Sequence, residues 1–193
     1  NELKSDKLFV IDALQFYEGS VFLHHVSVEL RNDREVVITA VKKYGLVLEL
    51  ASDKMKNDQE IVMTAVKQDG TALEYASDEM KNNQKVVMAA VGHNGLALEY
   101  ASNEMKNNLE VVMAAVEKNG RALVYASNEL KSDKIFVMDT LQSYDGSGFI
   151  HHMSVELQND REVVMAAMKN YGPTLGLVSN EMKNDQEIVM TAV

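Results

Sequence analysis

The sequence contains no cysteine, which removes disulfide bonds, thiolate nucleophiles and thiolate metal sites and leaves the redox compartment open. Long hydrophobic runs are missing too. The apolar stretch from Val111 to Val116 is among the longest, far short of the roughly 18 residues that a membrane span needs. Nothing at the start resembles a signal peptide. We therefore expect a soluble chain whose localisation the sequence leaves unknown.

Basic residues are in deficit. The 193 residues include 19 Lys and Arg against 29 Asp and Glu, which gives a formal net charge of -10. An acidic surface repels phosphate groups and argues against a nucleic-acid groove. The chain is otherwise ordinary for a globular protein, with 46% hydrophobic and 25% charged residues, so disordered and collagen-like classes are excluded.

A repeat of about 25 residues runs through the chain. Each block reads approximately A-S-x-E-M-K-N-N-x-E-V-V-M-A-A-V-x-x-N-G-x-A-L-E-Y. The register is fixed by recurring Ala-Ser pairs, with a glycine and a tyrosine in shared columns further along the block. We interpret residues 1–193 as a single repeat array whose units start near 1, 26, 51, 76, 101, 126, 153 and 178.

A longer period lies over the first. Residues 1–66 match residues 128–193 at an offset of 127, which is five blocks of 25 plus two. The two extra residues fall in longer units that carry Tyr17–His25 and Tyr144–His152. A five-unit cassette has therefore been duplicated. Because the last unit stops halfway, we expect the chain to be a fragment of a longer array.

Two helices are predicted in each unit. Asn107 followed three residues later by Glu110 has the spacing of a capping box, which predicts a buried helix over about 108–118. Gly120 is expected to end that helix in the left-handed C′ conformation. The pattern of alanine and leucine that follows predicts an amphipathic second helix over about 122–131.

The fold class predicted is all-α. Two helices of about ten residues cannot bury their apolar faces alone, so neighbouring units must stack into an α-solenoid. The only proline, Pro173, directly follows Gly172 and so lies at an expected helix boundary. The expected contact core, with its column partners, is Leu98, Ala101, Met105, Val112, Ala115 and Val116.

The unit from Ala97 to Gly120 resembles the repeats of domain-of-unknown-function family 4116. The resemblance covers essentially the whole chain and is weakest in the two longer units, where Phe9–Leu14 and Phe136–Leu141 depart from the V-V-M-A-A-V pattern. It implies tandem helical arrays in microbial proteins. It implies no activity and no site residue.

Two histidine pairs are the local candidates for metal binding or acid-base chemistry. Neighbouring residues on a helix point about 100° apart, so one pair cannot chelate as an i, i+4 pair does. The pairs replace an ordinary Glu-Tyr pair and lie beside a phenylalanine. A structural role and a pH-sensitive partner contact both remain open for these residues. The candidate contacts are Phe22, His24, His25, Phe149, His151 and His152.

The other chemical motifs have structural explanations. Repeated carboxylates such as Glu60 and Asp58 fit helix caps and first turns. The glycines of Gly146–Gly148 fit a two-residue insertion and lack a P-loop lysine. The methionine column at Met63, Met88 and its equivalents is more typical of core than of a ligand groove. We therefore expect no catalytic residue, no metal and no cofactor.

Variation between units is concentrated at one column block, which a solenoid places along one edge. The block includes Tyr44 and Tyr171, which we take as further candidate partner contacts, and His93, which we expect to be solvated. Neutral drift on a solvated rim would give the same variation.

Three function classes remain. The sequence favours a non-catalytic helical-repeat scaffold that mediates protein-protein interaction, with protein partners or neighbouring copies of the chain as its binding partners. The alternative is a structural or linking subunit of a large macromolecular assembly. An enzyme or a nucleic-acid reader is the least favoured, since the chain shows no catalytic group and is acidic.

Overall fold

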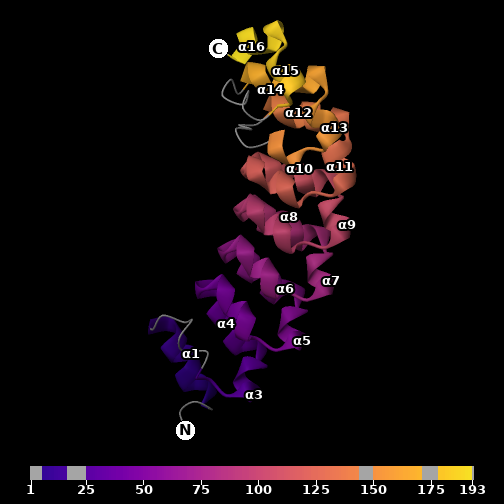
Figure 1. Cartoon of the computed structure of the whole chain (residues 1–193). Coiled ribbons are helices and arrows are strands. Elements are labelled where there is room, and N and C mark those ends of the chain that lie inside the picture. The colour runs from indigo at the N-terminus through magenta and orange to yellow at the C-terminus, as the bar shows by residue number, and fades with distance from the viewer. Residues whose placement is uncertain (1–5, 17–24, 144–149, 171–177, 193) are drawn as a thin grey trace.

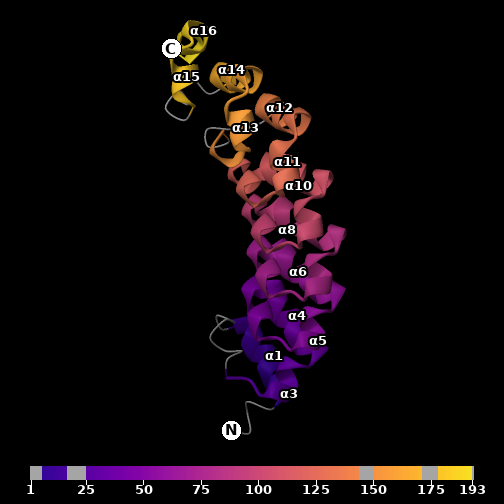
Figure 2. The same cartoon turned by 45° about the vertical axis from the view of Figure 1, so that its right-hand side comes forward.

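The computed structural model describes residues 6–16, 25–143, 150–170 and 178–192. Short helical segments stack in chain order along a gently curved rod, with the N-terminal and C-terminal parts at opposite ends (Figure 1). The second view shows the same order of helices and a bend of the rod beyond α11 (Figure 2). The chain is therefore an α-solenoid, as its repeats predict.

Each ordinary unit consists of three elements, a short α-helix, a ten-residue α-helix and a 3-10 helix. The long helices are α1 (Lys7–Phe16), α4 (Arg34–Lys43), α6 (Gln59–Gln68), α8 (Gln84–His93), α10 (Leu109–Lys118), α12 (Lys134–Ser143), α14 (Arg161–Asn170) and the shorter α16 (Gln186–Ala192). The short helices are α3 (Val28–Arg31), α5 (Asp53–Lys56), α7 (Asp78–Lys81), α9 (Asn103–Lys106), α11 (Asn128–Ser132), α13 (Val155–Gln158) and α15 (Asn180–Lys183). The 3-10 helices are η2 (Gly45–Leu50), η3 (Gly70–Tyr75), η4 (Gly95–Tyr100), η5 (Gly120–Tyr125) and η6 (Ile150–His152).

The long helices form where the apolar run predicts them, but their N-cap lies one residue later than expected. Asn108, rather than Asn107, caps α10, and its side chain accepts a hydrogen bond from the Val111 amide at 3.1 Å. Glu110 is consequently the second residue of the helix, so the reciprocal capping box does not form. The equivalent caps are Asp33, Asp58, Asn83, Asp133, Asp160 and Asp185.

Asn107 instead ends the short helix α9 and holds the next unit. Its side-chain oxygen accepts a hydrogen bond from the Ser127 hydroxyl at 2.5 Å. The same serine caps α11, accepting from the Leu130 amide at 3.2 Å, and its own amide donates to the Lys106 carbonyl at 2.9 Å. The Ala-Ser signature of the repeat is thus a helix cap that also joins consecutive units.

The expected second helix over 122–131 is wrong. Residues 120–125 form η5, and Ala126 and Ser127 are extended, with ψ of 159° and 158°, before α11 begins at Asn128. The hydrogen bonds that Ser127 makes to the preceding unit replace those of a continuous helix. The regular spacing of Ala122, Ala126 and Leu130 therefore reflects three buried positions, one in η5, one in the extended link and one in α11.

The glycine column does not adopt the left-handed conformation predicted for Gly120, because no glycine among the described residues has positive φ. The turn is made by the preceding residue, which is extended, as at Asn119 with φ -156° and ψ 110°. Glycine is required for close approach instead. A Cβ at Gly95 would overlap the Ala115 carbonyl oxygen of the next long helix, and Gly45 and Gly70 lie against the equivalent atoms.

The core runs the length of the rod between the long helices and the 3-10 helices. All six residues of the expected contact core are buried, with exposed fractions between 0% and 6%. Consecutive long helices pack on one another, and η2, η3 and η4 each pack against their own long helix and the next one. No unit closes its core alone, which is the packing that a solenoid requires.

Ion pairs join the N-terminal ends of consecutive long helices at both ends of the rod. Lys134 bonds Asp160 at 2.8 Å and Glu162 at 2.8 Å, and hydrogen bonding to Lys134 lowers the pKa of Asp160. Exposed pairs of this kind contribute little stability. The other pairs join Lys7 to Asp33 and Glu35, Arg34 to Asp58 and Glu60, and Arg161 to Asp185 and Glu187.

Candidate functional site

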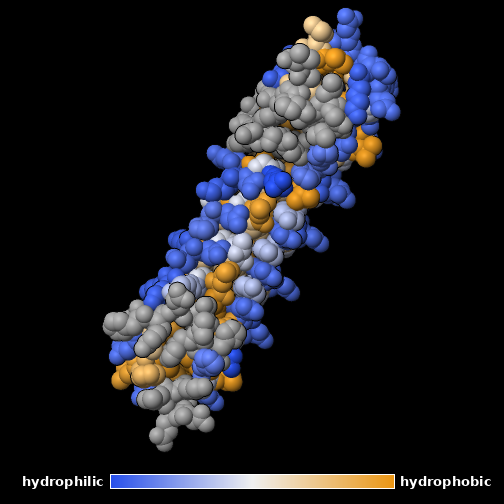
Figure 3. All heavy atoms as spheres, turned by 60° about the vertical axis from the view of Figure 1, so that its left-hand side comes forward, coloured by the Kyte–Doolittle hydropathy of each residue, from blue (hydrophilic) through white to orange (hydrophobic). Residues whose placement is uncertain are grey.

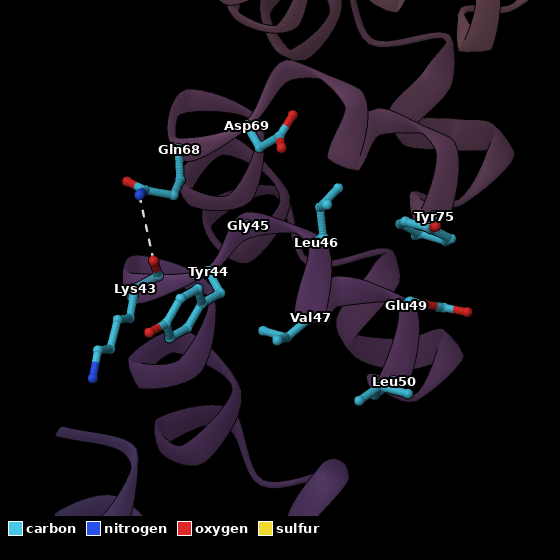
Figure 4. A pocket seen from close by; sticks show the side chains of 10 residues that line it. All are labelled: Lys43, Tyr44, Gly45, Leu46, Val47, Glu49, Leu50, Gln68, Asp69 and Tyr75. Atoms are coloured by element: carbon cyan, nitrogen blue, oxygen red, sulfur yellow. Dashed lines mark hydrogen bonds between the residues drawn. The ribbon is translucent and has the colours of Figure 1, made fainter. Parts of the chain in front are cut away.

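A hollow of about 460 Å³ opens at the edge of the rod between η2 and η3. Leu46 has 45% of its surface exposed there. The Tyr44 ring lies on one side of the hollow, whereas Tyr75 and Glu49 lie on the other (Figure 4). The lining residues are Lys43, Tyr44, Gly45, Leu46, Val47, Glu49, Leu50, Gln68, Asp69 and Tyr75.

Tyr44 stands at a position that caps the 3-10 helix in other units. The side chains of Asp69, Asn94 and Asn119 each accept a hydrogen bond from the amide two residues later, at 2.9 to 3.1 Å. Tyr44 makes no side-chain cap bond to η2. The chain therefore gives up a stabilising contact at this position and gains an aromatic wall.

Leu50 is the second departure from the repeat. The same column holds tyrosine in the next three units, at Tyr75, Tyr100 and Tyr125. Each of these rings is half-buried against the core. A leucine is shorter than a tyrosine, so Leu50 leaves space beside Leu46 that a ring would otherwise occupy. The hollow therefore lies where Tyr44 takes the place of a small capping residue and Leu50 takes the place of a tyrosine.

The charges around the hollow are unequally engaged. The Asp69 carboxylate accepts from the Thr71 amide at 2.9 Å and from its hydroxyl at 2.6 Å. Lys43 donates to the Leu14 carbonyl at 3.3 Å and points away from Leu46 (Figure 4). Glu49 is exposed and has no hydrogen bond or ion pair to any residue in the described ranges. Its carboxylate is therefore available at the rim.

A row of glutamates continues from the hollow along the 3-10 helices. Glu74 and Glu99 occupy the column of Glu49, and each lies beside a tyrosine of the next unit. The pKa of Tyr125 is raised by its hydrogen bond to Glu99 and by burial, and that of Tyr100 by burial and by Glu74. Val124 ends the row, since it occupies the glutamate column in the following unit.

The histidine candidates lie elsewhere, and the structure describes only some of them. His25 and His151 are exposed, and His152 is half-buried. The pKa of His152 is lowered by burial and by the positive charges of His151, Lys131 and Arg121. Nothing in the described residues brings these histidines to the hollow. Phe22, His24, Phe149 and Tyr171 lie outside the described residues, as does the Gly146–Gly148 motif.

His93 is exposed as expected but is not merely solvated. Its Nδ1 accepts a hydrogen bond from the Gly70 amide of the preceding unit at 3.1 Å. The imidazole therefore provides an acceptor for the first amide of η3 from the following unit. This variable-rim residue has a structural role between two units.

Apolar side chains form a broken stripe along one face of the rod, flanked by hydrophilic residues (Figure 3). The methionine column is half-buried and packs against the core at Met63, Met88, Met113 and Met165, while Met190 is 71% exposed. Val28 and Val155 are also well exposed, at 68% and 69%. These two valines begin the short helices that follow the longer units.

No group of three or more metal-binding side chains is found within the described residues. Over the same parts of the chain, no helix has the length and apolarity to cross a bilayer. The arrangement around Tyr44 combines aliphatic side chains on the inside with a carboxylate at the rim. Sequence analysis identified Tyr44 as a candidate but missed Leu46, Glu49 and Leu50. The interruption of the tyrosine column at Leu50 was the available signal.

Stacked three-element units with a hollow on one edge define an α-solenoid repeat protein. The profile of the family described as "Domain of unknown function (DUF4116)" matches the chain repeatedly, and the chain belongs to this family, as its repeats suggest. No curated protein and no solved structure matches the chain significantly. The seven overlapping matches cover residues 6–56, 33–81, 58–106, 83–131, 108–158, 133–181 and 160–193.

Proposed function

We propose that the chain is a non-catalytic helical-repeat scaffold that binds a protein partner at the hollow between η2 and η3. The observation that carries the proposal is that the hollow is built from departures from the repeat. Tyr44 forgoes a cap bond, and Leu50 replaces a ring that packs in three other units. Positions where a regular structure gives up a stabilising contact are good candidates for function.

The test is a selection from a random-peptide library on the purified chain. We expect the enriched peptides to slow amide hydrogen exchange in η2 and η3, since a ligand in the hollow restricts opening of the backbone around it. A chain with Tyr44→Asn, which restores the ordinary cap, serves as the control and is expected to lose this protection. Enriched peptides that protect only other units would contradict the proposal.

An assembly subunit is the second candidate, and the exposed valines favour it. Val28 and Val155 occupy a column where other units have aspartate or asparagine, and both are more than two-thirds exposed. Val28 follows His25 by three residues, and Val155 follows the equivalent His152 by three. Apolar side chains repeated at one offset on a rod can pack against a neighbouring copy.

This candidate predicts self-association that the valines control. In sedimentation experiments, the average mass of the wild-type chain should rise with concentration, and the double variant Val28→Asp, Val155→Asp should stay monomeric. Aspartate is tolerated there because it stands at the first position of a short helix, where negative charge is favourable. The control Asn128→Asp changes the same column and should leave association unchanged. A wild-type chain that is monomeric throughout would rule out this candidate.

A further inference from the structure

We propose that the partner segment is extended and basic, that an arginine or lysine side chain fills the hollow, and that basic residues three and six positions along pair with Glu74 and Glu99. This inference rests on the proposed function, because it names the chemistry of the partner at the same hollow. It gives the exposed glutamate row a role in addition to the interactions of Glu74 with Tyr100 and of Glu99 with Tyr125 of the next unit.

The walls of the hollow suit a side chain with an apolar stem and a charged end. Leu46, Val47 and Leu50 provide aliphatic surface, and Tyr44 and Tyr75 provide rings. Lysine and arginine bury an aliphatic stem along such surface while the charged group stays at the rim. Their cationic groups are also attracted to the faces of tyrosine rings. A purely apolar side chain would leave the rim carboxylate without a partner.

The structure already shows a cation at one of these rings. The Lys43 ammonium lies 5.5 Å from the centre of the Tyr44 ring. Its side chain points away from Leu46 and Leu50, so it leaves the inner part of the hollow open (Figure 4). The Glu49 carboxylate at the opposite rim is free to bind an incoming cation, because it has no hydrogen bond or ion pair among the described residues.

The glutamate row determines how far apart the basic residues of the partner should lie. Glu49, Glu74 and Glu99 lie one unit apart on successive 3-10 helices, and all three are exposed. Packed helical layers are separated by about 8 to 10 Å. An extended chain advances about 3.3 Å per residue, so three residues span about 10 Å. Basic residues at every third position of an extended partner therefore have about the same spacing as the glutamates.

The length of the partner segment is bounded at the other end of the row. The glutamate column is occupied by Val124 in η5, and Arg121 of the same element is exposed. The pKa values of the neighbouring groups agree with a change of sign along the edge. Burial raises the pKa of Tyr75, and the Glu74 and Glu49 carboxylates add to this, whereas burial lowers the pKa of His152, with further contributions from His151, Lys131 and Arg121. Three basic residues, and no fourth, match this edge.

The experiment measures binding of designed peptides to the purified full chain by fluorescence anisotropy. The first peptide carries arginine at every third position, the second has the same residues with the arginines adjacent, and the third has leucine in place of arginine. We expect the first to bind at least about tenfold more tightly than either of the others, an advantage that decreases as salt is raised.

Variants of the chain then test the residues. Glu49→Gln should weaken binding of the first peptide about tenfold, which corresponds to one charge-assisted contact. Glu117→Gln, which removes an exposed carboxylate from the end of α10, should change it less than about twofold. Tyr44→Asn and Leu50→Tyr should abolish binding. Both restore the residue found in other units, so their unfolding midpoints should equal or exceed the wild-type value.

The outcomes separate this inference from the proposed function. If the leucine peptide binds at the hollow as tightly as the spaced arginine peptide, the scaffold function stands and a basic partner is excluded. The inference is also overturned if adjacent and spaced arginines bind equally, or if Glu49→Gln behaves as Glu117→Gln does. If neither the designed peptides nor the library-derived peptides bind near η2 and η3, the hollow is no docking site and both proposals fail.

Discussion

Replacement of Ala115 by aspartate should destabilise the array by about 3 to 5 kcal/mol, the typical cost of an uncompensated charge in a protein interior. Ala115 has an exposed fraction of 0% and belongs to α10, which packs against α8, η4 and η5. A carboxylate at this position would be charged without being hydrated by water. The measurement is the free energy of unfolding from denaturant titration at pH 7.

The pH dependence provides a second check on Ala115→Asp. Burial without a partner raises the pKa of a carboxyl group above its unfolded value near 3.9. The penalty is therefore absent when the carboxyl is protonated in both states and grows as the pH rises through the unfolded pKa. The difference between variant and wild type should be smaller at about pH 4 than at pH 7.

Lys118→Asp is the matched control for this charge. Lys118 belongs to the same helix but is exposed at its C-terminal end. Surface substitutions of this kind change stability by no more than about 0.5 kcal/mol. Equal unfolding free energies for Ala115→Asp and Lys118→Asp would show that the buried face of α10 has been assigned wrongly.

The long helices and the core could be predicted because their signals are local. An apolar run of fixed length needs burial on most sides, and Val112 and Val116 are buried accordingly. The exact cap could not be predicted from spacing. Asn107 and Asn108 are equally competent as caps, and what separates them is the bond from Ser127 in the next unit, which a single unit does not reveal.

The second helix was predicted wrongly for a related reason. The spacing of Ala122, Ala126 and Leu130 fits one helical face, and intrinsic propensity gives no reason for a break. The break is caused by contacts between units. The Ser127 amide and hydroxyl both bond the preceding unit, and these bonds require an extended backbone at Ala126. Tertiary contacts therefore override a local pattern.

The candidate site could be predicted only in part. Tyr44 was identified because its column holds different residues in different units. Leu50 could also have been found from the sequence, because the next three units have tyrosine in its column. The space between them depends on the relative sizes of side chains from two units. The size of this space cannot be predicted from residue spacing. Leu46 and Glu49 could therefore be identified only from the stacking of η2 on η3.

Glycine packing supplies the other large effect. A Cβ added at Gly95 would overlap the Ala115 carbonyl oxygen and would lie 3.0 Å from the Asn119 backbone nitrogen. Both atoms belong to the backbone of the next unit, so relief requires α10 and η4 to separate. Overpacking of this kind typically costs about 1 to 3 kcal/mol. Gly95→Ala should lower the unfolding free energy by this amount, measured by denaturant titration.

Gly92→Ala, three residues away, should have the opposite sign. Apart from its chain neighbours and the backbone of its own helical turn, no atom lies within 4 Å of the position that its Cβ would occupy, and residue 92 is exposed within α8. Alanine reduces the freedom of the unfolded chain and is the better helix former, so it should stabilise the protein by about 0.5 to 1 kcal/mol.

The substitution Gly95→Asn tests why the repeat has glycine in this column. If the glycine were needed for a left-handed turn, Gly95→Asn would be tolerated better than Gly95→Ala, because asparagine adopts that conformation more readily. With close approach as the cause, asparagine should be at least as destabilising as alanine, since it carries the same Cβ into the same carbonyl.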